Sequence, residues 1–70
     1  MTVLEIIRQI KSEKESVKIF PTYARQGDVR TLSGLSEEDF RKEVKELRDF
    51  GVIKVKRGIN HYFLEIVEDV

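Results

Sequence analysis

Apolar residues near the start of the chain recur every three or four positions, which is the spacing of one face of a helix. Thr2 precedes this pattern and Glu5 follows three residues later, as in a capping box, where each side chain bonds to the backbone amide of the other residue. The pattern ends in the polar stretch 12–16, so we predict a helix over residues 3–14. Its apolar face would consist of Val3, Ile6, Ile7 and Ile10.

Residues 17–20 alternate in polarity and include β-branched side chains, which favours a short extended segment. Pro21 would end it, because proline has no amide hydrogen to donate to a neighbouring strand and disfavours helical backbone at the preceding residue. Residues 22–27 carry no decisive pattern, and 23–26 are compatible with one helical turn before Gly27. We therefore predict a strand at 17–20 and assign no element to the residues that follow it.

Two further helices are predicted from their end signals. Asp28 is a residue type that caps helices, and Gly34 suits the left-handed backbone that ends one, which indicates a short helix over 28–33. Ser36 is the N-cap of a longer helix over 36–50, and Gly51 ends that helix. The longer helix has an acidic first turn (Glu37, Glu38 and Asp39), an apolar stripe (Phe40, Val44 and Leu47), staple positions at Leu35 and Phe40, and Val52 placed to contact Leu47 in a Schellman ending.

The C-terminal part of the chain alternates in polarity over two stretches, which predicts a β-hairpin over 52–67. Gly58 and Ile59 would be the central residues of a two-residue turn, with glycine where a type II′ turn requires it. Val55 would then face Tyr62 across the strands. One face of the hairpin would carry Ile53, Val55, Tyr62, Leu64 and Ile66, and the other Lys54, Lys56, His61, Phe63 and Glu65.

The order helix, short strand, helix, turn, helix and hairpin resembles the winged helix-turn-helix family. The resemblance is carried by the stretch 27–40, with its Gly-Leu-Ser turn, and by the Leu-x-x-x-Gly-x-Ile pattern at 47–53 ahead of a basic hairpin. It implies an α+β fold in which three helices pack on a short antiparallel hairpin, the wing. We expect a single domain over residues 1–70, since the chain is too short for a second core.

The resemblance further implies that the helix at 36–50 enters the major groove of DNA and that the hairpin lies along the backbone or minor groove. Cations lie opposite the apolar stripe of this helix and near the hairpin tip, where the two elements would straddle phosphates. The expected partner is double-stranded DNA, and the expected role is transcription regulation. The predicted nucleic-acid-binding residues are Arg30, Arg41, Lys42, Lys45, Arg48, Lys54, Lys56 and Arg57.

Charge supports two other interpretations. The 13 Lys and Arg residues balance 13 Asp and Glu residues, whereas a DNA-binding domain usually has a basic excess. Alternating Glu and Lys is also typical of a solvated helix face, with Glu38–Lys42 and Lys45–Asp49 as i, i+4 pairs. The acidic first turn would repel phosphates. The alternatives are a solvated face alone, or a winged-helix module that docks on a protein partner and binds no nucleic acid.

The sequence lacks the residues that catalysis and metal binding require. The chain has no Cys and a single histidine, His61, so a zinc site has too few ligands and a nucleophilic serine has no nearby base. Consecutive acidic residues in one helical turn point in different directions, and helix capping explains them without a metal. We predict no enzymatic activity, no cofactor, no metal and no small-molecule substrate.

Strand alternation places Phe63 on the face opposite the core, near Val67. Either the helix at 3–14 or the strand at 17–20 covers this ring, or it marks a contact between two subunits through self-association. No apolar run approaches the roughly 20 residues that span a bilayer, and the N-terminus shows no signal-peptide pattern. We therefore expect a cytoplasmic protein without a membrane partner.

Overall fold

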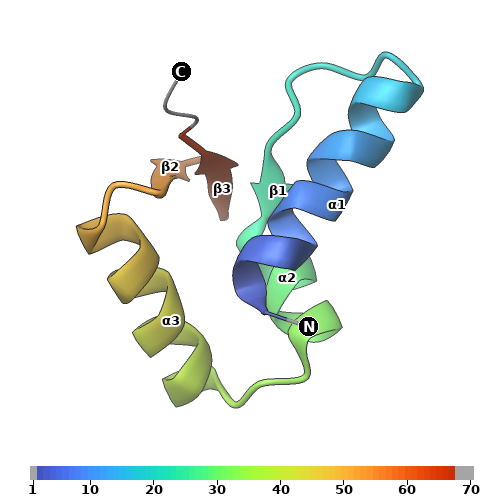
Figure 1. Cartoon of the computed structure of the whole chain (residues 1–70). Coiled ribbons are helices and arrows are strands. Elements are labelled where there is room, and N and C mark those ends of the chain that lie inside the picture. Colours follow the sequence, from blue (N-terminus) through green and yellow to red (C-terminus); the bar gives the residue numbers. More distant parts are fainter. Residues whose placement is uncertain (1, 68–70) are drawn as a thin grey trace.

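A computed structural model describes residues 2–67 and places them in three helices and one three-stranded antiparallel sheet (Figure 1). The α+β class is confirmed for this part of the chain, and residues 1 and 68–70 of the predicted domain lie outside the described residues. In chain order the elements are α1 (Val3–Ser16), β1 (Ala24–Arg25), α2 (Gln26–Ser33), α3 (Glu37–Asp49), β2 (Ile53–Arg57) and β3 (Tyr62–Ile66).

Helix α1 begins where the sequence predicts and ends two residues later. The Glu5 amide donates a hydrogen bond of 3.2 Å to Oγ1 of Thr2, which confirms the N-cap. The helix then continues through the polar stretch to Ser16. Glu and Lys are good helix formers and need no buried face, so the loss of apolar residues does not end the helix.

The predicted strand at 17–20 is wrong, because these residues close α1 in a Schellman motif. The Lys18 amide donates to the Glu15 carbonyl at 3.1 Å, and the Ile19 amide donates to the Lys14 carbonyl at 2.8 Å. Lys18 takes the left-handed conformation, with a φ of 58°, that glycine usually supplies. No glycine marks this helix end, so the β-branched alternation is the stronger signal in the sequence.

The first strand instead lies at Ala24–Arg25, where the sequence predicts no element. It pairs antiparallel with β3, with Ala24 opposite Leu64 and Arg25 opposite Phe63. The strand order is β1–β3–β2, so β3 is central and β1 and β2 form the two edges. A two-residue strand has too little sequence pattern to be recognised before its partner is known.

Helix α2 begins at Gln26, two residues before the predicted start, so Gly27 lies inside the helix and Asp28 is not its cap. The chain passes directly from β1 into α2, and the N-cap residue Arg25 makes no side-chain capping hydrogen bond. The predicted end is confirmed, because Gly34 has a left-handed φ of 68°. The strand pairing, rather than a capping side chain, sets where this helix starts.

Both ends of α3 match the prediction. The Asp39 amide donates to Oγ of Ser36 at 3.2 Å, as expected for an N-cap. Gly51 has a φ of 74°, and the Val52 amide donates to the Leu47 carbonyl at 2.9 Å, which is the predicted Schellman ending. This turn leads the chain directly from α3 into β2.

The hairpin of β2 and β3 forms with a register that differs from the predicted one by two residues. Val55 lies opposite Leu64 rather than Tyr62, and Arg57 lies opposite Tyr62. The connecting loop is therefore the four-residue segment 58–61 instead of a two-residue turn. An even shift leaves the strand residues on their predicted faces, because successive side chains point to opposite sides of a sheet.

Close approach of another residue, rather than turn conformation, explains the glycine at position 58. The predicted type II′ turn requires a positive φ at Gly58, and the residue does not have one. A Cβ atom there would lie 2.7 Å from Cε2 of Phe63 and 2.9 Å from the carbonyl oxygen of His61. The Gly58 amide donates to that same carbonyl at 2.7 Å.

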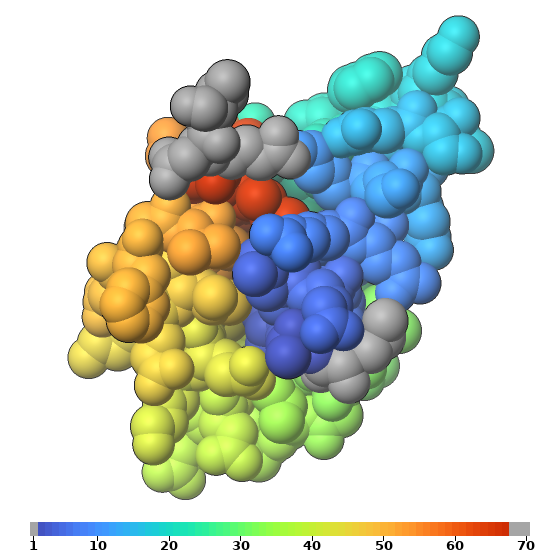
Figure 2. Space-filling model, in the orientation of Figure 1, coloured from blue at the N-terminus to red at the C-terminus, as the bar shows by residue number. Residues whose placement is uncertain are grey.

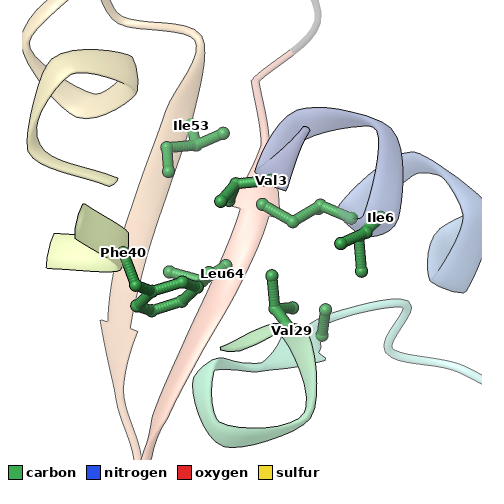
Figure 3. Close-up of a cluster of buried hydrophobic side chains, with 8 residues drawn as sticks. Val3, Ile6, Val29, Phe40, Ile53 and Leu64 are labelled. Atoms are coloured by element: carbon green, nitrogen blue, oxygen red, sulfur yellow. The ribbon is translucent and has the colours of Figure 1, made fainter. Parts of the chain in front are cut away.

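The core lies between the helices and one face of the sheet (Figure 3). Figure 2 shows the start of α1 in the middle of one side of the molecule, with α3 beside it and β3 above it. Each helix and strand contributes a residue that is at most 2% exposed, and no polar side chain is buried among the described residues. The buried residues are Val3, Ile6, Ile7, Ala24, Val29, Phe40, Ile53 and Leu64.

Two glycine substitutions are expected to change stability in opposite directions. Gly51→Ala lowers the free energy of unfolding by about 1 kcal/mol, because alanine is strained in the left-handed region even where space is open. Gly27→Ala, at an open position inside α2, raises it by about 0.5–1 kcal/mol. Urea unfolding measures both values, and a loss of stability in Gly27→Ala would contradict the early start of α2.

Candidate nucleic-acid interface

The eight cations that the sequence predicts as nucleic-acid ligands are all exposed. Four of them lie on α3, three lie on β2, and one lies on α2. Helix α3 packs against β2, so the two larger groups occupy neighbouring elements. These residues are Arg41, Lys42, Lys45 and Arg48 on α3, Lys54, Lys56 and Arg57 on β2, and Arg30 on α2.

The cations of α3 form a stripe along the exposed side of the helix. Arg41, Lys45 and Arg48 are spaced i, i+4 and i+7, so they follow one another along the helix surface. Each of these cations directly follows a residue of the apolar stripe (Phe40, Val44 and Leu47), so the cationic stripe lies about 100° around the helix from the stripe that packs into the core. The core packing of α3 therefore leaves its cationic stripe in solvent.

Within the described residues, some of these cations are in ion pairs and others are not. Arg41 Nη2 lies 2.7 Å from Oε1 of Glu37, one helical turn earlier, and both side chains are exposed. An exposed pair of this kind adds little stability, but a phosphate would have to compete with it. The pairs suggested by sequence spacing for Lys42 and Lys45 do not form within residues 2–67.

Lys56 is held by side chains on the outer face of the sheet, away from the core. Its Nζ donates to the Tyr23 hydroxyl at 2.7 Å and lies 4.4 Å from the centroid of the same ring. Oε2 of Glu65 is 3.2 Å from this ammonium group. The hydrogen bond to Tyr23 and then the one to Glu65 raise the pKa of Lys56 above its ordinary value of 10.5, so it stays charged in neutral solution.

Strand alternation separates the cations of β2. Lys54 and Lys56 point to the outer face of the sheet, whereas Arg57 lies on the other side, in line with Val55. Lys54 is opposite Glu65 in the register, but that carboxylate binds Lys56, and Lys54 has no ion-pair partner among the described residues. Only part of the predicted wing cluster therefore faces the same way.

Phe63 is partly buried and contacts two aromatic side chains that the sequence does not place beside it. The ring lies 6.1 Å from the ring of Tyr23 and makes an edge-to-face contact with His61 at 4.6 Å. Val67 is partly buried, and its amide donates to the Val52 carbonyl at 2.8 Å. A subunit contact through Phe63 and Val67 stays a prediction.

Arg25 is a candidate binding residue that the sequence pattern does not reveal. Its position opposite Phe63, which in turn lies opposite Lys56, places two cations on either side of an aromatic ring in one row across the three strands. The row depends on pairing between distant segments. A basic residue in an unassigned segment gives no sign of that pairing.

Residues 2–67 contain neither a metal-binding cluster nor a membrane-spanning helix. Within residues 2–67, no group of three or more His, Asp or Glu side chains is arranged to hold a metal ion. None of the helices in that range combines the length and apolar character of a bilayer span.

Comparison of the chain with models of protein families, with curated proteins and with solved structures gives no match.

Removing one hydroxyl tests the environment of Lys56. In Tyr23→Phe the hydrogen bond from Nζ is lost, so the pKa of Lys56 falls toward 10.5, as measured by NMR titration of its Cε signal. Because the folded pKa is raised, this contact stabilises the fold below the unfolded pKa, and its contribution is lost as pH rises through the folded pKa. Tyr62→Phe is the matched control, and an equal fall in that variant would contradict the assignment.

Proposed function

We propose that this domain binds double-stranded DNA as a winged helix, with α3 in the major groove and the β2–β3 hairpin as the wing. The observation that carries the proposal is the exposed stripe of Arg41, Lys45 and Arg48, which flanks the buried side of α3 and lies on an element that packs against the hairpin. The element order and the strand order β1–β3–β2 are compatible with this arrangement.

The acidic first turn of α3 restricts how the helix would approach DNA. Glu37, Glu38 and Asp39 are exposed and would be repelled by phosphates if the helix entered the groove by its N-terminus. The middle and the C-terminal half of the helix carry Lys45 and Arg48, which have no ion-pair partner within the described residues. We therefore assign the base and phosphate contacts to this part of α3.

The strength of binding would come mainly from phosphate contacts. Two of the eight candidate cations, Arg41 and Lys56, are in ion pairs, and the other six have none among the described residues. Contacts to about four to six phosphates give a slope of about −4 to −5 in a plot of log affinity against log salt concentration. Such a slope distinguishes DNA binding from contacts that do not release counterions.

A protein partner on the same face of α3 is the second candidate function. The Arg41–Glu37 pair makes the face mixed in sign, and the formal charge of the chain is zero. Both features suit a charged protein surface better than a uniform array of phosphates. This function predicts that the α3 face does not respond to duplex DNA.

Anisotropy titrations of labelled random duplex DNA at several salt concentrations test the proposal. Binding is expected at low salt, and Lys45→Gln combined with Arg48→Gln should weaken it and reduce the magnitude of the salt slope by about 2. The control, Arg8→Gln combined with Lys18→Gln, removes the same charge from exposed positions on and after α1 and should leave the slope unchanged.

Two results would overturn this assignment. One is the absence of binding at low salt, which would leave the protein partner as the function of the α3 face. The other is an equal loss of slope in both double variants, which would show that net charge rather than the α3 stripe determines binding.

A further inference from the structure

A groove of about 510 Å³ lies between the end of α1 and the outer face of the sheet, on the side of β1. In Figure 1 the segment that leads into β1 follows the last turn of α1 and descends along the edge of the sheet. We call this hollow the β1 groove. It is lined by Lys14, Ile19, Phe20, Pro21, Tyr23, Arg25, Lys56, Arg57 and Phe63.

The apolar part of the β1 groove is unusually open to solvent. Phe20 is 70% exposed and Ile19 is 54% exposed, and Pro21 beside them is also exposed. Neighbouring exposed apolar side chains that share one hollow are more informative than single ones scattered over a surface. The chain thus leaves an apolar surface available at this position.

The rim of the β1 groove is strongly basic in a chain of zero net charge. Four of its nine lining residues are cations and none is acidic. Lys56 is engaged by Tyr23 and Glu65, but Arg25 and Arg57 have no hydrogen-bond or ion-pair partner among the described residues. Of these two, Arg25 lies on the outer face beside Phe63, so its guanidinium group is available for a ligand, and guanidinium geometry suits a carboxylate bound through two hydrogen bonds.

Hydrogen bonds within the chain hold the walls of the groove in place without a ligand. Lys14 Nζ donates to the Tyr23 carbonyl at 2.6 Å, which ties the last turn of α1 to the segment that leads into β1. The Schellman motif at Lys18 fixes the direction in which Ile19 and Phe20 leave the helix. A preformed site loses less conformational entropy when it binds.

The aromatic rings favour a peptide over single-stranded nucleic acid. Base stacking along a strand needs several open ring faces, whereas Lys56 lies over the Tyr23 ring and Phe63 contacts both Tyr23 and His61. Phe20 is the one strongly exposed ring among those lining the groove. This arrangement accepts one bulky apolar side chain rather than a series of bases.

We propose that the β1 groove binds an acidic peptide segment of a partner protein. A bulky apolar side chain of the segment packs on Ile19 and Phe20, and a flanking carboxylate binds Arg25. The site goes beyond the proposed DNA contacts, because its apolar part and Arg25 lie after α1 and on β1, whereas α3 packs against β2. Lys56 and Arg57 are the residues common to both sites.

The test uses the whole chain and a labelled eight-residue peptide with a central tryptophan flanked by glutamates. Addition of the peptide to ¹⁵N-labelled protein should shift amide signals in 19–25 and 56–63 and leave those of α3 unchanged. Arg25→Glu and Phe20→Ala should each weaken binding at least tenfold. Phe20 is largely exposed, so Phe20→Ala is expected to fold even if Arg25→Glu perturbs β1.

Controls separate this site from the α3 face. Lys42→Glu reverses a charge on α3 and should leave peptide affinity unchanged, and a peptide with serine in place of tryptophan should bind at least tenfold more weakly. Absence of shifts in the groove, shifts centred on α3, or tighter binding of an eight-nucleotide oligothymidylate would each overturn the proposal. Duplex titrations report on the α3 face separately, so either proposal can fail without the other.

Discussion

Strand β3 pairs with β1 on one side and β2 on the other, and this double pairing determines which residues meet elsewhere in the molecule. Leu64 is fully buried between its strand neighbours and the helices, so one face of the sheet is committed to the core. The preceding residue, Phe63, therefore faces outward, with Arg25 and Lys56 on either side of it. A one-residue slip would exchange the two faces and destroy both arrangements at once.

Local chemistry in the sequence was sufficient to predict the helix ends that depend on one or two residues. Ser36 and Gly51 bound α3 because a hydroxyl cap and a left-handed glycine act within a single turn. The end of α1 could not be predicted in this way, since Lys18 adopts the conformation without being glycine. The close approach of Phe63 and of the His61 carbonyl to Gly58 could not be predicted either, because these atoms meet only once the strands have paired.

The candidate sites show the same division between local and distant information. The exposed cations of α3 follow from helical spacing alone, so the sequence predicts both their positions and their exposure. The contact between Lys56 and Tyr23 does not follow from local spacing. Tyr23 is 33 residues away in the chain and reaches Lys56 only through the pairing of β1 with β3. The β1 groove is likewise a product of tertiary structure, and its free guanidinium at Arg25 lies in a segment with no local pattern.

The direct passage from β1 into α2 gives Arg25 three simultaneous roles. It is the last residue of a strand, the N-terminal boundary of the next helix, and part of the wall of the β1 groove. With no linker to absorb movement, a displacement of its backbone is also a displacement of the first turn of α2. The wall of the groove at Arg25 and the start of α2 therefore share one stretch of backbone.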